Sequence, residues 1–161
     1  MRIIALNGML YPLRKWLPSR VETPYRWTWR EQDADALSAT IQEPTALVGF
    51  SVGATAAARI ALTNPWIKIA YLHSPGNYEG PFIETQCIFR IFRTEGDTTP
   101  TFDSSQQLHS SLKQQKDFTS SPLVTLPFVP FKSPTLWERW ALARRRHIFH
   151  NILPYLPIRK K

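Results

Sequence analysis

Residues 46–58 of the chain read ALVGFSVGATAAA, and this stretch decides the fold. An apolar strand runs into a turn in which Gly49 and Gly53 stand two residues before and after Ser51, and an alanine-rich helix follows. The glycines leave room where side chains would crowd a tight turn. Such a turn projects the serine hydroxyl from the sheet and aims the first helix amides at the group that the serine attacks. The alternative is an ordinary strand–turn–helix connection, since glycine and serine are common in loops.

The length and composition indicate a globular protein. A chain of 161 residues with a hydrophobic fraction of 43% can bury a sizeable core. We expect a single domain over residues 1–161, with a basic helical C-terminal segment at 134–161. No apolar run approaches the roughly 20 residues of a membrane-spanning helix. Residues 1–8 lack the features of a signal peptide, and Cys87 is the only cysteine, so we expect a cytoplasmic protein in which Cys87 packs in an apolar strand.

Apolar runs alternate with helical patterns along most of the chain. This alternation predicts an α/β fold, a three-layer sandwich whose mostly parallel sheet of about five to six strands carries helices on both faces. Strands are predicted at Arg2–Leu6, Val21–Trp29, Thr45–Phe50, Ile67–Leu72, Gln86–Phe92 and Leu123–Val129. Helices are predicted at Asp33–Ile41, Val52–Leu62, Thr101–Lys116 and over most of Thr135–Leu156. Pro24 places the second strand at an edge or breaks it.

Two polar residues follow strands at the edge where parallel sheets bind ligands. Ser51 follows the third predicted strand, and Asp97 follows the fifth, within the sequence TEGDTTP at residues 94–100. Ligands bind at the carboxyl ends of parallel strands, so both side chains are candidates for one site. The alternative for Asp97 is a turn residue that bonds its own backbone, a common role for aspartate beside glycine.

A serine hydroxyl is a poor nucleophile until a base removes its proton. His73 ends a strand, and we interpret it as a loop histidine with ordinary contacts. His109 lies in a polar helix, and we expect it to face solvent. No pair of histidines has a convincing metal spacing. The chain offers four histidines in all: His73, His109, His147 and His150.

These features resemble those of the α/β-hydrolases, in a small, lid-poor, esterase-like form. The serine turn matches the family's nucleophile elbow, and residues 97–100, DTTP, resemble its Asp-x-x-Pro acid loop. Residues 7–9, Asn-Gly-Met, resemble the family's His-Gly-x oxyanion loop with Asn in place of His. A histidine near the C-terminus would complete the family's order of Ser, Asp and His. The resemblance covers roughly residues 1–156, and the two amino-terminal strands of larger members are missing from the pattern.

The resemblance implies a serine hydrolase that cleaves an ester or thioester through an acyl-serine intermediate, without a cofactor or metal. Ser51 would be the nucleophile, and the amides of Val52 and Met9 would form the oxyanion hole. Asp97 would orient the catalytic histidine. The short chain leaves a shallow site, which suits a small-molecule ester or an acyl group displayed on a larger polymer.

The position of the base is left open by the residues. The family carries its histidine before the final helix, where residues 130–143 of this chain hold none. If residues 134–145 form a separate helix, His147 opens the final helix beside the serine, and we take it as the expected base. His150 is the alternative base. If residues 135–153 form one helix, both histidines lie in mid-helix and neither reaches the serine.

The net charge of +8 is concentrated at the C-terminal end. From Glu138 onward there are seven basic residues against one acid, and three of them stand together as Arg144, Arg145 and Arg146. This is either a solvated helix face with a basic tail or a surface that contacts a polyanion. The second interpretation carries the alternative function, a non-catalytic hydrolase-like module that docks on an anionic partner. A nucleic-acid-associated protein is the third hypothesis, although no RNA-binding aromatic motif or zinc spacing is present.

Overall fold

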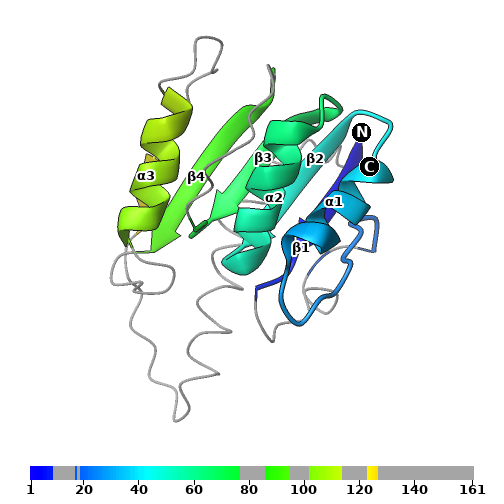
Figure 1. The fold of residues 1–161 in the computed structure, drawn as a ribbon, viewed down its shortest axis with the longest axis horizontal. Helices are drawn as coiled ribbons and strands as arrows, with labels where there is room; N and C mark the ends of the chain where they lie inside the picture. Colours follow the sequence, from blue (N-terminus) through cyan, green and yellow to red (C-terminus); the bar gives the residue numbers. More distant parts are fainter. Residues whose placement is uncertain (9–16, 18, 77–85, 95–101, 114–122, 127–161) are drawn as a thin grey trace. The chain divides into compact units, whose positions relative to one another are not determined.

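The structure is a computed structural model, which describes residues 1–8, 17, 19–76, 86–94, 102–113 and 123–126. The chain divides into two compact units, Met1–Leu126 and Pro127–Lys161, and every described residue belongs to the first. Helices stand between most of its consecutive strands, which confirms the predicted α/β class (Figure 1). The strands are β1 (Arg2–Leu6), β2 (Thr45–Phe50), β3 (Ile67–His73), β4 (Ile88–Thr94) and β5 (Leu123–Leu126). The helices are α1 (Glu31–Ala39), α2 (Val52–Thr63) and α3 (Phe102–Lys113).

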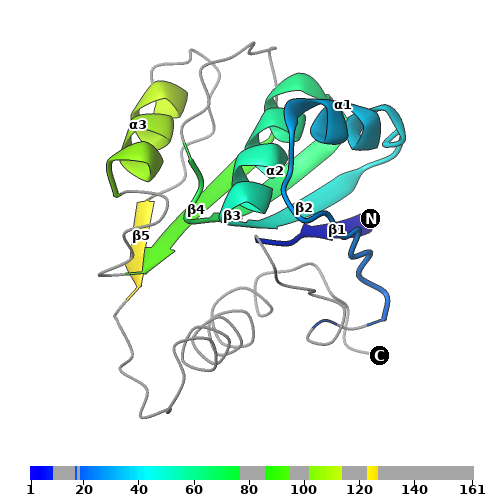
Figure 2. The ribbon, with the colours of Figure 1, turned by 60° about the horizontal axis from the view of Figure 1, so that its bottom comes forward.

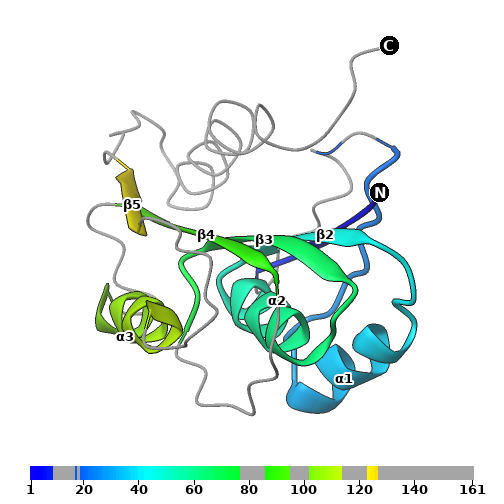
Figure 3. The ribbon, with the colours of Figure 1, turned by 90° about the horizontal axis from the view of Figure 1, so that it is seen from above.

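The described strands form one parallel sheet in the order β1-β2-β3-β4-β5, with β5 beside β4 in Figure 2. Parallel neighbours need crossover connections, and such connections are almost always right-handed. Because each strand is added on the same side of the one before it, right-handed crossovers place their helices on one face. Figure 3 shows α1, α2 and α3 together on that face. The parallel sheet is therefore confirmed, and helices on the second face would lie outside the described residues.

The predicted strand Val21–Trp29 is wrong. This segment contributes a single β-bridge, in which the Glu22 N–H donates to the Ile3 carbonyl at 2.9 Å and the Ala5 N–H donates to the Glu22 carbonyl at 2.8 Å. Pro24 follows two residues later and has no N–H to continue a ladder. The segment therefore pairs with β1 at one residue rather than along a strand.

This bridge still shows where the order in which strands are added to the sheet reverses. Glu22 pairs with the edge of β1 opposite to the edge that pairs with β2. The chain thus steps outward from β1 to Glu22 and then returns past β1 to form β2. In open parallel sheets, ligands bind at the carboxyl ends of the strands where the order reverses in this way. The topology places that point at the ends of β1 and β2.

The core lies between the sheet and the described helices. Alternate residues of the strands point to the helical face and are fully buried, because that face is sealed by α2. Alanine predominates on α2, so its backbone packs close to the sheet, as the sequence predicts. The large strand side chains in this core cluster include Ile4, Leu6, Leu47, Leu72, Phe89 and Ile91. The buried alanines of α2 are Ala54, Ala56, Ala57, Ala58 and Ala61.

Helix α1 begins two residues before the predicted start. The sequence places the first residue at Asp33, whereas the helix starts at Glu31. The reason is the Asp33 carboxylate, which accepts a hydrogen bond from the Arg30 N–H at 3.1 Å and satisfies an amide at the helix start. The acidic first turn also complements the positive end of the helix dipole.

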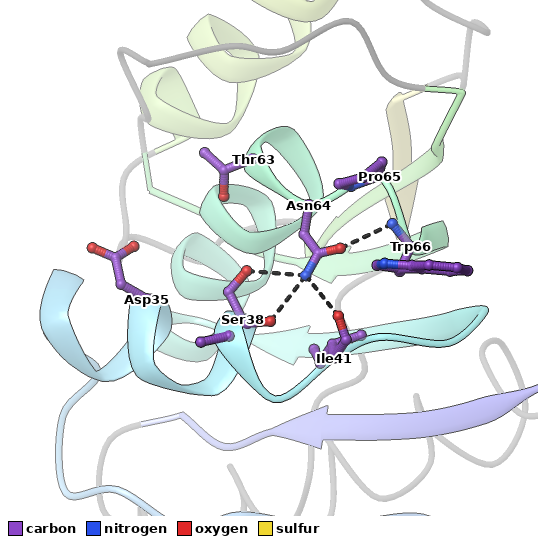
Figure 4. A pocket seen from close by; sticks show the side chains of 8 residues that line it. Asp35, Ser38, Ile41, Thr63, Asn64, Pro65 and Trp66 are labelled. Atoms are coloured by element: carbon purple, nitrogen blue, oxygen red, sulfur yellow. Dashed lines mark hydrogen bonds between the residues drawn. The ribbon is translucent and has the colours of Figure 1, made fainter.

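Asn64 joins the segments that meet at the amino ends of the strands, which we call the amino edge of the sheet. It follows α2, and its side-chain amide donates to the carbonyls of Ser38 and Ile41 at 2.9 and 3.2 Å (Figure 4). Its side-chain oxygen accepts from the Trp66 N–H at 2.9 Å. A pocket forms around this junction, lined also by Asp35. It lies at the amino ends of the strands, opposite to the edge that carries Ser51, and the Asn64 amide is engaged within the protein.

We predict that Asn64→Asp lowers the free energy of unfolding by about 3 kcal/mol, because a carboxylate cannot donate and would face the two carbonyl oxygens. Urea denaturation would measure the change. Gln42→Glu is the matched control, since it makes the same chemical change at an exposed residue nearby and should shift stability by less than about 0.5 kcal/mol. Equal effects of the two substitutions would contradict the assigned role of Asn64.

Candidate active site

Ser51 stands between β2 and α2 in a backbone conformation that is rare for a residue with a side chain. Its φ is 54° and its ψ is −120°. A non-glycine residue in such a conformation stores about 1–3 kcal/mol of strain. The surrounding backbone holds it there: the Ser51 N–H donates to the His73 carbonyl at 2.9 Å, and the Ser51 carbonyl accepts from the N–H groups of Ala54 and Thr55 at 2.8 and 3.1 Å.

The two glycines of the serine turn (residues 49–53) are required by close backbone contacts. A Cβ atom on Gly49 would lie 2.5 Å from the Ala54 Cα atom, which is too close for any real contact. A Cβ atom on Gly53 would overlap the carbonyl oxygens of Leu6 and Asn7. The first turn of α2 is therefore pressed against the end of β1. This contact brings the serine turn beside the loop that follows β1.

Val52 is the residue for which the sequence predicts a role as oxyanion-hole donor, and that role stays a prediction. It is the first residue of α2, so its N–H has no partner within the helix. The amino end of a helix also carries a partial positive charge, which favours an anion beside Ser51. The second expected donor, Met9, lies outside the described residues. Its neighbours Asn7 and Gly8 are described, and Asn7 lies against the first turn of α2.

The Asn7 side chain ties the loop after β1 to the segment before α1. It is buried, and its amide donates to the carbonyls of Gly8 and Arg26 at 2.7 and 2.6 Å. Its oxygen accepts from the Arg26 N–H and from the Trp29 indole N–H, both at 3.1 Å. The sequence identified Asn7 only as the residue that replaces a family histidine. Its partners could not be inferred, because they lie far along the chain.

The loop after β3 is fixed to the same helix turn. The Gly76 N–H donates to Thr55 Oγ1 at 2.7 Å, and the Ser74 N–H donates to the Phe92 carbonyl at 2.7 Å. Ser74 also has a positive φ, of 50°. Sequence reasoning did not identify Thr55, although its place one helical turn after Ser51 is a signal that could have done so. The loop after β1, the serine turn and the loop after β3 thus meet at the carboxyl edge of the sheet.

The structure corrects the placement of two histidines. His73 is the last residue of β3 and is buried, rather than part of the following loop. Its ring lies 6.0 Å from the Phe50 ring, and its carbonyl supports Ser51. His109 is buried in α3 and does not face solvent. It stands beside Leu108, on the edge of the helix stripe that packs against the sheet.

The other predicted site residues lie outside the part of the chain that the structure describes. These are the expected acid, the expected base and its alternative, and the arginine cluster. Their roles stay predictions. The residues concerned are Asp97, His147, His150, Arg144, Arg145 and Arg146.

Cys87 is confirmed as a packing residue. It is buried just before β4, and burial raises the pKa of its thiol well above the usual range. It is therefore not a nucleophile at neutral pH. Within the described ranges, no group of three histidine, cysteine or carboxylate side chains is placed to hold a metal ion. No helix among those ranges is long and apolar enough to cross a membrane.

The strain at Ser51 predicts an order of stability for two variants of this residue. Ser51→Gly should be more stable than Ser51→Ala by about 1 kcal/mol, because glycine adopts a positive φ without steric cost and this gain exceeds its entropic cost. The urea midpoints of the two variants would measure the difference. An alanine variant more stable than the glycine variant would show that the turn is unstrained.

The contact at Gly53 predicts a substitution that reverses the usual helix preference. Gly53→Ala should destabilise the protein by about 3 kcal/mol, because the added methyl group would meet two carbonyl oxygens of the β1 end. Without that contact, alanine in a helix would stabilise by about 1 kcal/mol. Thermal and urea unfolding would give the sign. A gain in stability would exclude the close approach of α2 to β1.

Comparison with known proteins identifies the fold but not a sequence family. No protein-family model and no curated protein matches the chain. A provisionally assigned YdeN-like hydrolase from Pectobacterium atrosepticum matches with a TM-score of 0.56 and 16% identity, over 91% of this chain and 90% of that one. A provisionally assigned dienelactone hydrolase from Klebsiella pneumoniae matches with a TM-score of 0.57 and 10% identity, over 92% and 85% of the two chains. The protein Atu2452 of Agrobacterium tumefaciens, of unknown function, matches with a TM-score of 0.55 and 18% identity, over 91% and 89%.

Identities this low establish the architecture alone. The matches cover most of both chains in each case, so they concern the whole arrangement and not one strand–helix unit. The chain therefore has the fold of the α/β-hydrolases.

Proposed function

We propose that this protein is a serine hydrolase that cleaves an ester or thioester through an acyl-serine intermediate. The observation that carries the proposal is the backbone of Ser51, which holds a φ of 54° at the strand–helix junction. A protein keeps such strain where surrounding contacts enforce it, most often at a functional site. An ordinary strand–helix turn would need neither this conformation nor the two glycines that make room for it.

The proposed reaction begins with attack by Ser51 Oγ on the carbonyl carbon of the substrate. A bond forms between these atoms, and the hydroxyl proton passes to the base. The negative oxygen of the tetrahedral intermediate would accept hydrogen bonds from the amides of Val52 and Met9. The C–O or C–S bond then breaks, and the leaving group takes the proton from the base. Water adds to the acyl-serine, releases the acid and restores the hydroxyl.

The base is proposed from the sequence. His147 takes and returns the proton in this mechanism, and His150 is the alternative. Asp97 orients the imidazole and stabilises its charged form. At the carboxyl edge of the sheet, Ser51, Asn7 and the loop after β3 already meet, which supports this edge as the site of the reaction.

Two further observations favour hydrolysis over binding alone. The free amide at the start of α2 and the positive end of its dipole suit an oxyanion that develops beside Ser51. Two of the structural neighbours are named as hydrolases, and one of these is named for a lactone, which is a cyclic ester. Small esters, or acyl groups on a larger polymer, are the proposed substrates.

A fluorophosphonate probe tests the mechanism, because it forms a covalent bond only with an activated serine. We expect rapid labelling of the wild-type protein and none of Ser51→Ala. His147→Ala should slow labelling by about 100-fold or more if it is the base, whereas His150→Ala should change it little. Intact-protein mass spectrometry would measure the rates.

The opposite pattern between the two histidine variants would assign the base to His150. If the folded wild-type protein is not labelled at all, the hydrolase proposal fails. The alternative function, a hydrolase-like module that binds an anionic partner, would then be favoured.

A further inference from the structure

Two large aromatic side chains are exposed on the segment between β1 and α1. Trp27 is 62% exposed and Tyr25 is 44% exposed, and both lie in the short segment 25–29. Single exposed apolar residues need no explanation in a soluble protein. Two aromatic rings so close together in a short segment are less common, because exposing them forgoes the burial of large apolar surfaces.

The backbone that carries these rings is held rigidly. Arg26 stands between them, and both its N–H and its carbonyl bond the Asn7 side chain at 3.1 and 2.6 Å. Its guanidinium lies 3.6 Å from the Asp33 carboxylate of α1. A segment fixed by a buried side chain keeps its exposed neighbours in a defined place, which lowers the entropic cost of binding a ligand.

The segment lies at the same edge of the sheet as Ser51. Asn7 bonds Arg26 through its side chain and lies against Gly53 through its carbonyl oxygen. Gly53 is two residues from Ser51, within the serine turn. One residue, Asn7, therefore connects the exposed aromatic segment to the serine turn.

We propose that Trp27 and Tyr25 bind the apolar part of the ester that Ser51 cleaves. This inference rests on the proposed function and adds a substrate class to it: esters with a medium-length alkyl or aromatic acyl group are preferred over acetyl esters. An indole face gains contact with each added methylene of the acyl chain, whereas an acetyl group is too short to leave the serine turn. The two rings determine specificity and take no part in the proton transfers.

The test compares the hydrolysis of p-nitrophenyl octanoate and p-nitrophenyl acetate by the full chain. Trp27→Ala should lower kcat/KM for the octanoate by about ten-fold and leave the acetate unchanged within about two-fold. Trp27→Phe should retain most of the preference for the longer ester. Trp66→Ala is the matched control, because Trp66 is also exposed, at 43%, but lies at the amino edge of the sheet (Figure 4).

A Trp27→Ala variant with an unchanged ratio between the two esters would overturn the inference. The same loss in Trp66→Ala as in Trp27→Ala would overturn it as well, since the effect would then not be local. Fluorophosphonate labelling of Ser51 in each variant separates these outcomes from failure of the proposed function. A wild-type protein that neither reacts with the probe nor cleaves either ester would overturn both proposals together.

Discussion

The close contact between the first turn of α2 and the end of β1 is the constraint on which the rest of this site depends. At Gly53 the helix has no side chain, so its backbone meets the carbonyl oxygens of Leu6 and Asn7 directly. This contact sets the position of Ser51 relative to the loop after β1. It also requires the unusual φ of Ser51, because the chain must reverse within one residue to pass from β2 into a helix so near the sheet.

The handedness of the crossovers explains why the two edges of the sheet differ. All three described helices lie on one face, and each runs back from the carboxyl edge to the amino edge. The amino end of α2, where the Val52 N–H has no partner within the helix, therefore lies at the carboxyl edge beside Ser51. At the amino edge, Asn64 satisfies the carbonyl groups at the end of α1. The carboxyl edge thus carries the start of α2 at Ser51, whereas the amino edge is closed by internal hydrogen bonds.

The sequence predicted the elements whose signals are local. The strands β1 and β2 have the predicted bounds, and α2 extends only one residue further, because apolar runs, glycines and a closing Asn-Pro are all contiguous in the chain. Of the two failures, the first has a local cause and the second depends on distant contacts. The apolar character of Val21–Trp29 suggested a strand, but Pro24 limits it to one bridge. The polar surroundings of His109 concealed its burial, which follows from the packing of α3 on the sheet.

The candidate site divides in the same way. The serine turn was recognisable because its geometry depends on five consecutive residues, 49–53. The roles of Asn7 and Thr55 were not, since each is defined by a partner some twenty residues away. Parallel pairing has a related effect on folding, because β1 pairs Arg2 with Thr45 and can join the sheet only after β2 exists. A nascent chain that has produced only β1 therefore has no strand to pair with, and the junction that holds Ser51 can form only after β2 and α2 have been synthesised.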